Sequence, residues 1–229
     1  MLGRHTRRLF KLGCRAACRA YLRLWHRFEA QGLEHVPPHG PGLALTNHAS
    51  LLDIPALIAV DHLEDGTMLA KASLFKVPLV RQVLDAWGAI PVERKGRDLA
   101  GIRALMAALR QGRMVAVAAE GRRTRSGRLE PIHPVLARIA LNANVPLVPI
   151  GIAGSFAALP PGAVFPRPRK ILLRVGEPFR LPPGTSEEEA ARRIRDAIAA
   201  LLPPEQRPLE AGLGPEGRPS DGHEGAPRP

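Results

Sequence analysis

Short apolar runs alternate with longer stretches of helical periodicity through the middle of the chain. The apolar runs predict strands, and the stretches between them, whose apolar positions recur at helical spacing, predict helices. The expected strands are 43–46, 67–70, 89–93, 114–119, 147–152 and 171–175. The expected helices are 54–60, 72–86, 98–110, 133–142 and 187–202. This alternation predicts an α/β fold: a mixed, largely parallel sheet flanked by helices on both faces.

The N-terminal stretch has a basic pattern of helical period. Eight Lys or Arg residues and no acid precede Glu29. At 100° per residue, Arg4, Arg8, Lys11, Arg15 and Arg19 share one face, and Phe10, Ala17, Tyr21, Leu24 and Phe28 share the opposite face. The pattern predicts an N-terminal amphipathic helix that lies in a membrane interface. The alternative is a surface helix that docks on its own domain.

Charge and Pro/Gly content divide the chain into three segments. Residues 1–31 form the basic interfacial helix, and residues 32–202 form the α/β domain. Residues 203–229 contain twelve Pro or Gly in 27 positions and predict a disordered tail. The longest uncharged stretch, 139–166, is interrupted by Pro and Gly, so it predicts no transmembrane helix.

Composition narrows the function classes. The 229 residues are 45% hydrophobic and carry a net charge of +12, which fits a globular domain with a sizeable core. Aromatic residues make up only 4%, which argues against base stacking and a nucleic-acid partner. The two cysteines, Cys14 and Cys18, form no disulfide framework, and no Cys/His cluster has zinc spacing. We therefore expect no metal and a reducing, cytosol-facing compartment.

The densest chemistry lies between a predicted strand and the next helix, a junction where α/β sheets bind ligands. His48 and Asp53 are five positions apart, so a turn could bring the carboxylate to the imidazole. The free ring nitrogen would then serve as a general base. The alternative is a helix-capping Asp53 and a surface His48. No Gly-x-Ser-x-Gly elbow, Walker loop or dinucleotide fingerprint occurs, so the base would act directly on a substrate hydroxyl.

Two other segments suit anions. Gly88–Arg94 is a predicted strand that ends in a charged pair, and Glu120–Arg128 places four Arg beside one acid after an apolar strand. Gly121 would permit a tight turn, and the guanidinium groups could bind a phosphate through paired hydrogen bonds. A solvated basic loop is the alternative.

The chain resembles the glycerolipid acyltransferases over about residues 32–179. The resemblance rests on four segments in order: Asn47-His48-x4-Asp53, Gly88–Arg94, Glu120-Gly121 and Val145–Ile150. The bacterial 1-acyl-sn-glycerol-3-phosphate acyltransferases are the most similar group. The resemblance implies transfer of a fatty acyl group from acyl-CoA or acyl-carrier protein to a lysophospholipid hydroxyl. The acceptor implied is 1-acylglycerol 3-phosphate, which would give phosphatidic acid without a metal or bound cofactor.

Roles for single residues follow from the same resemblance. It implies that His48 is the catalytic base and Asp53 its partner. The implied substrate-binding residues are Asn47, Ser50, Lys71, Arg94, Glu120, Gly121, Arg122 and Arg123. The family's third segment usually has an aromatic residue and a proline before Glu-Gly-Thr-Arg. Here Ala118 and Ala119 stand in front, and Arg122 replaces the threonine.

This departure leaves the acceptor open, and another lyso-lipid or a glycolipid precursor is an alternative. A function of a different class is a non-catalytic basic protein that binds membrane or nucleic acid. The partners we expect are a lysophospholipid, a thioester donor and an anionic membrane surface, with no nucleic acid. The expected location is peripheral, on the cytoplasmic face of the cell membrane.

Overall fold

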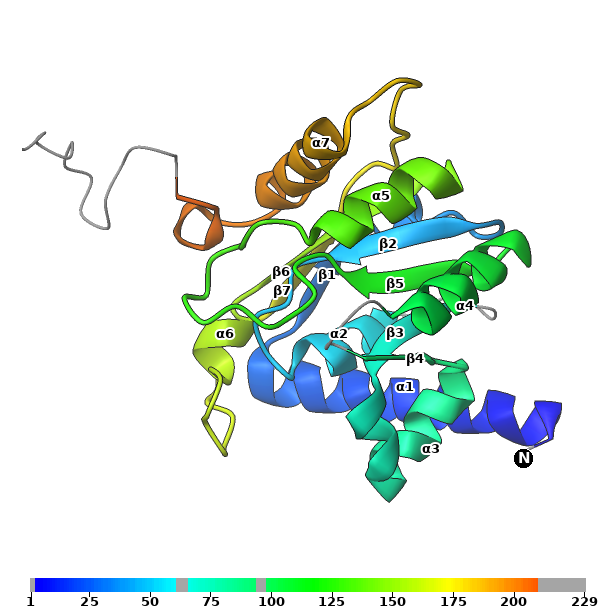
Figure 1. Ribbon diagram of the computed structural model, residues 1–229. Coiled ribbons are helices and arrows are strands. Elements are labelled where there is room, and N and C mark those ends of the chain that lie inside the picture. The colour runs from blue at the N-terminus through cyan, green and yellow to red at the C-terminus, as the bar shows by residue number, and fades with distance from the viewer. Residues whose placement is uncertain (1–2, 61–65, 94–97, 210–229) are drawn as a thin grey trace, which may run out of the picture.

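A computed structural model describes residues 3–60, 66–93 and 98–209 and has an α/β architecture (Figure 1). Its strands are β1 Glu29–Gln31, β2 Gly42–Thr46, β3 Thr67–Lys71, β4 Ile90–Val92, β5 Met114–Ala118, β6 Leu147–Ala153 and β7 Leu172–Val175. They form a seven-stranded sheet in the order β1-β7-β6-β2-β5-β3-β4. Neighbouring strands are parallel except for the antiparallel pair β6 and β7. The predicted mixed, largely parallel sheet is confirmed.

Helices cover both faces of the sheet, as predicted. Figure 1 shows α1 (Arg4–His26), α2 (Asp53–Val60) and α3 (Pro78–Trp87) below the sheet. The opposite layer contains α4 (Leu99–Arg110), α5 (Pro134–Ala143) and α7 (Glu187–Ala200). The short α6 (Ser155–Ala158) follows β6, and the 3₁₀ helices are η1 (Leu33–His35), η2 (Ala72–Lys76) and η3 (Pro204–Gln206).

The central strand β2 is buried on both faces. Leu43 and Leu45 pack with α4, α5 and α7, whereas Ala44 packs with the layer that contains α1 and α2. Its neighbour β6 is buried at every position, which is typical of a strand in the middle of a covered sheet. The carboxyl end of β2 therefore lies on a rigid, closely packed support.

The expected helix over 72–86 is interrupted. Residues 72–76 form the 3₁₀ helix η2, and α3 starts at Pro78. Proline has no N–H and disfavours helical backbone in the residue before it, so Val77 adopts an extended conformation and the helix restarts. The other expected strands and helices are present, with ends shifted by at most two residues.

Besides the 3₁₀ helices η1 and η3, one strand and one α-helix were not predicted from the sequence. The three-residue β1 carries one apolar residue and so lacks a strand pattern; it forms by parallel pairing with β7. The sequence assigns residues 29–31 to the N-terminal segment 1–31, whereas the structure places them in the sheet. The four-residue α6 is too short to show a helical period.

The predicted start of the disordered tail is wrong. Pro204–Gln206 form η3, and the Gln206 side chain is buried against the domain by hydrogen bonds to other segments. Proline and glycine counts missed this order because side-chain contacts to distant residues hold the segment in place. Residues 210–229 lie outside the described part of the chain.

Part of the basic face of α1 packs against the domain. Lys11 is buried with its ammonium over the Trp87 ring, 5.2 Å from the ring centroid. The Arg19 guanidinium donates to the Ala59 carbonyl at the end of α2, with 2.8 Å from Nη2 to oxygen. Basic side chains satisfy the unpaired carbonyls in the last turn of a helix, which explains why this face packs on α2 and α3.

The exposed side of α1 carries several apolar residues beside Arg8 and Arg23. Leu9, Leu12 and Leu24 are exposed, and Leu24 is 87% exposed. Phe10 and Phe28, which the sequence places on the outward apolar side, pack into the interior. Within the described residues, no helix has the length and apolar character needed to cross a membrane.

Candidate active site

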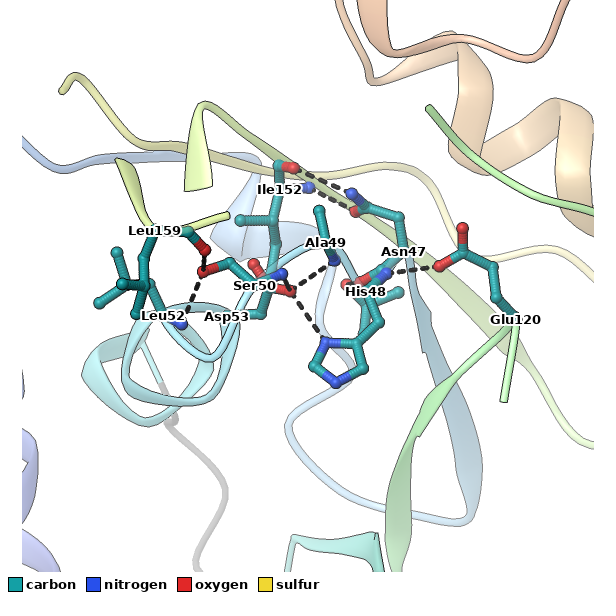
Figure 2. Close-up of polar contacts among 10 residues, drawn as sticks. Asn47, His48, Ala49, Ser50, Leu52, Asp53, Glu120, Ile152 and Leu159 are labelled. Carbon is teal, nitrogen blue, oxygen red and sulfur yellow. Dashed lines mark hydrogen bonds and ion pairs between the residues drawn. The ribbon is translucent and has the colours of Figure 1, made fainter. Parts of the chain in front are cut away.

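The loop between β2 and α2 holds the candidate catalytic residues. β2 ends at Thr46, and α2 begins at Asp53, so the loop crosses the carboxyl ends of the neighbouring strands β5 and β6. Figure 2 shows its polar contacts. This is the edge of a parallel sheet where α/β proteins bind ligands.

His48 and Asp53 form the pair that their spacing predicts. Nδ1 of His48 lies 2.9 Å from Oδ2 of Asp53, and the two side chains are 15% and 2% exposed. An ionised carboxylate only accepts, so Nδ1 carries the proton and Nε2 presents a lone pair. Figure 2 shows Nε2 pointing away from Asp53 and from the other residues drawn. The imidazole is thus oriented to take a proton from a molecule outside the protein.

Main-chain groups hold the Asp53 carboxylate in place. Its Oδ2 also accepts the N–H groups of Ala49 and Ser50, each at 2.8 Å. Asp53 is the first residue of α2, where the helix dipole favours a negative charge. Three donors therefore fix the position of the carboxylate beside His48.

Asn47 and Ser50 direct their polar groups into the protein. The Asn47 amide exchanges two hydrogen bonds with the main chain of Ile152 in β6, at 2.9 and 2.8 Å. The Ser50 hydroxyl donates to the Leu159 carbonyl at 2.8 Å and is fully buried. The sequence assigned substrate binding to both residues, whereas these contacts use their side chains to anchor the loop.

Glu120 supports the same loop from β5. Its side chain is buried, and its two oxygens accept the N–H groups of His48 and Glu130 at 2.7 and 2.8 Å. Burial raises the pKa of the Glu120 carboxyl from 4.5 to about 7, although both hydrogen bonds oppose the increase. The carboxylate thus braces the His48 backbone from within the protein, although the sequence proposed it as a substrate ligand.

We call residues 121–130 the basic loop. Gly121 opens it with φ of +70°, a conformation that favours glycine, and an added Cβ would lie 3.1 Å from the His133 ring. The Thr124 N–H donates to the His48 carbonyl at 2.9 Å, which joins the loop to the segment between β2 and α2. The arginines of the basic loop are therefore tied to the segment that carries His48.

The predicted cationic ligands differ in their surroundings. Arg122 forms an ion pair with Glu130, with 3.0 Å between Nη2 and Oε2. Arg123 is half-buried and has no ion pair with the described residues. Lys71 is exposed at the end of β3. Arg94 lies outside the described residues. Of the two predicted cationic ligands in the basic loop, Arg123 is the one without an ion pair to the described residues.

Several residues of the site were missed at the level of sequence. Thr124, Ile152 and Leu159 contribute through main-chain groups, and side-chain chemistry gives no signal for such contacts. Within the described ranges, no group of three or more His, Cys, Asp or Glu could hold a metal ion. The site thus combines the Nε2 lone pair of His48, the Asp53 carboxylate bound to the same ring and the arginines of the basic loop.

Comparison with known families matches residues 27–153, more than half of the chain, to the family described as Acyltransferase. A chloroplastic 1-acyl-sn-glycerol-3-phosphate acyltransferase of Brassica napus is 28% identical over 142 residues, 61% of this chain and 41% of that protein. A Bos taurus protein described as a DGAT1/2-independent enzyme synthesizing storage lipids is 25% identical over 213 residues, 80% of this chain and 61% of that protein. The chain thus spans about two fifths to three fifths of the length of these relatives.

A solved structure shares the fold. The 1-acyl-sn-glycerophosphate (LPA) acyltransferase PlsC from Thermotoga maritima superposes with a TM-score of 0.73 at 24% sequence identity. The match covers 86% of this chain and 81% of that chain. The predicted fold class, including the N-terminal helix, is therefore confirmed by an independent structure.

Proposed function

Since the chain belongs to the acyltransferase family, we propose that it is an O-acyltransferase with a lysophospholipid acceptor. The acyl donor is a thioester of coenzyme A or acyl-carrier protein, and the preferred acceptor is 1-acylglycerol 3-phosphate. The observation that carries the proposal is the His48–Asp53 pair, with Nδ1 engaged at 2.9 Å and Nε2 directed outward. A basic loop tied to the same segment suits a phosphorylated acceptor.

In the proposed reaction, Nε2 of His48 removes the proton of the acceptor hydroxyl as its oxygen attacks the thioester carbonyl. The tetrahedral intermediate then collapses, the carbon–sulfur bond breaks, and the thiolate takes the proton from the imidazolium. Asp53 stabilises the positive imidazolium between these steps. Products are the ester and the free thiol, so no bound cofactor or metal takes part.

Acyl transfer proceeds directly between the substrates in this scheme. Ser50 is the nearest hydroxyl in the loop, but it is fully buried and donates to the Leu159 carbonyl. A nucleophile needs a base within hydrogen-bonding distance, and Nδ1 of His48 is occupied by Asp53. No acyl-enzyme is required, because the thiolate is a good leaving group.

A lipid-product assay tests the proposed function. Purified protein is supplied with acyl-CoA or acyl-carrier protein and with 1-acylglycerol 3-phosphate, other lyso-lipids and a glycolipid precursor in turn. Phosphatidic acid is the expected product. If another lipid is acylated instead, acyl transfer is supported and the assignment of the acceptor is wrong. If no acceptor leads to thioester consumption, the proposed function is contradicted.

Arg123→Ala should raise KM for 1-acylglycerol 3-phosphate by about 10- to 100-fold, because a hydrogen bond to a charged group contributes about 1.5–3 kcal/mol. KM for the thioester should stay unchanged. Steady-state kinetics with each substrate varied separately measures both constants. The control is Arg138→Ala, which removes an exposed arginine paired with Glu187 in the opposite helical layer. Equal KM values for wild type and Arg123→Ala would refute the phosphate assignment.

We also propose that the exposed side of α1 rests on an anionic lipid bilayer, since the acceptor is a lipid. Val164 and Phe165, 80% and 82% exposed, lie in the loop between α6 and β7. This loop meets the end of α1, where Nε1 of Trp25 donates to the Pro166 carbonyl at 3.4 Å. Exposed cations beside the apolar tip, Arg167 and Arg169, would attract anionic lipid.

Replacing Leu9, Leu12 and Leu24 together by serine should weaken binding to anionic vesicles by at least about tenfold. Each leucine loses much of the roughly 1.5–3 kcal/mol gained when it leaves water. Vesicle sedimentation measures the bound fraction, and the matched control is Leu99→Ser, an exposed leucine of the opposite layer. Unchanged vesicle binding by the triple variant would show that this face does not contact the bilayer. Added salt should weaken wild-type binding only in part, because screening leaves the apolar contribution.

A further inference from the structure

The segment that follows α7 packs against the basic loop. We call residues 203–207, which include η3, the C-terminal strap. The Leu129 N–H donates to the main-chain oxygen of Gln206 at 2.8 Å. Nη1 of Arg128 donates to the Arg207 carbonyl at 3.1 Å. The strap therefore fastens the far end of the basic loop, opposite the end that Thr124 joins to His48.

The Gln206 side chain joins the basic loop to the end of β6. Its Oε1 accepts the Gly154 N–H at 2.9 Å, and its Nε2 donates to the Gly127 carbonyl at 3.4 Å. The residue is only 8% exposed, so water does not readily replace these bonds. A primary amide accepts and donates at once, which suits it to a site with one N–H and one carbonyl. Gln206 thus connects the loop to the strand that also anchors the catalytic segment.

We infer that Gln206 is a positioning residue for the acyl acceptor. This inference rests on the proposed acyl transfer. An arginine of the basic loop can hold the acceptor phosphate usefully only if the acceptor hydroxyl then reaches Nε2 of His48. A loop that opens away from β6 presents its arginines to the phosphate in only a fraction of the molecules, which weakens binding of the acceptor, so the distance between the loop and β6 matters. Gln206 fixes that distance without touching the substrate.

Gln206→Leu in the full chain should raise KM for 1-acylglycerol 3-phosphate by about tenfold, while KM for the thioester stays unchanged. The change removes both side-chain hydrogen bonds at nearly constant volume. The control is Glu205→Gln, a change at the exposed neighbouring residue, for which both KM values should equal those of wild type. A residue needed only for folding would lower the active fraction and leave both KM values unchanged.

A second variant approaches the same contact from the loop. Arg128→Met removes the hydrogen bonds from the guanidinium to the strap, and it should raise the acceptor KM as Gln206→Leu does. The double variant should change KM by less than the product of the two single effects, because both act on one contact. This variant tests the strap even if Gln206→Leu fails to fold.

Trypsin cleavage gives a readout that does not depend on activity. The basic loop contains four arginines, and cleavage there requires local opening of the loop. Both variants should increase the cleavage rate after Arg122, Arg123 and Arg125, the sites that both keep, by about tenfold under native conditions, whereas Glu205→Gln should not. Peptide mapping by mass spectrometry assigns the cleaved bonds.

The outcomes distinguish failure of the inference about the C-terminal strap from failure of the proposed acyl transfer. Faster loop cleavage together with a higher acceptor KM supports the inference. Unchanged loop cleavage in both variants overturns it, whether or not the protein transfers acyl groups. Faster cleavage with an unchanged acceptor KM also overturns it, because the strap would then hold the loop without positioning the acceptor. If wild type consumes no thioester, the proposed function fails, and cleavage still decides whether the strap holds the loop.

Discussion

Replacing His48 by alanine should lower kcat for acyl transfer by at least about 10²-fold, because a positioned general base typically contributes 10²–10⁴-fold. The bond between Nδ1 and Asp53, 2.9 Å long, directs the basic Nε2 outward. Without the imidazole, the acceptor hydroxyl would have to lose its proton to water. Both KM values should change little, since the base acts in the transition state. Thioester consumption by purified variant and wild type measures the loss.

Chemical rescue separates loss of the base from loss of structure. The alanine variant leaves the space of an imidazole ring beside Asp53, so free imidazole in the buffer should restore part of the activity. The restored rate should increase with the concentration of neutral imidazole. Added imidazole should not increase the rate of the wild-type protein. Near-normal turnover by a folded His48→Ala protein, without imidazole, would show that another group takes the proton.

The contact between His48 and Asp53 was predictable because its geometry is local. His48 and Asp53 lie in one loop at a strand–helix junction, and the periodicity of the flanking segments fixes where that junction falls. The alternating apolar runs likewise predicted the sheet, since strands such as β2 and β6 must be buried on both faces. Local patterns of this kind need no knowledge of distant contacts.

The anchoring of the site was not predictable from the sequence. Asn47 and Glu120 act on main-chain groups of Ile152 and His48, and any residue presents such groups. The family resemblance implied that they are substrate ligands, but only the folded chain reveals that their polar atoms are already engaged. The polar atoms of these residues thus make contacts within the fold that the sequence did not show.

The orientation of α1 depends on contacts with other helices, which the periodicity of its own sequence does not reveal. The helical pattern separates a basic face from an apolar one, and either face could pack on the domain. The ends of α2 and α3 present carbonyls to α1, and Arg19 and Arg7 donate to them. These contacts turn much of the basic face inward, and the exposed side of α1 carries apolar residues beside Arg8 and Arg23.

Glu120→Gln should change both the pH dependence of stability and the rate of acyl transfer. The pKa of the Glu120 carboxyl is about 7 in the folded protein and near 4.5 in the unfolded chain. Burial raises this pKa more than the hydrogen bonds from Glu130 and His48 lower it, and the negative charges of Glu130 and Asp53 raise it further. The folded state therefore holds more protons between these values. The free energy of unfolding of wild type should fall by about 3 kcal/mol as the pH rises from 4.5 to above 7, relative to the variant.

Urea unfolding of both proteins across this pH range measures the difference, in which the titration of all other groups cancels. Glu188→Gln, a change at an exposed carboxyl of α7, should keep the wild-type pH dependence. The glutamine amide can accept only one of the two N–H groups that Glu120 binds, so the other loses its acceptor and the His48 backbone shifts. We expect a kcat about 10- to 100-fold below wild type, because catalysis depends closely on the position of the base. A stability difference that stays constant with pH, together with full activity, would mean that the Glu120 charge neither costs folding energy nor positions His48.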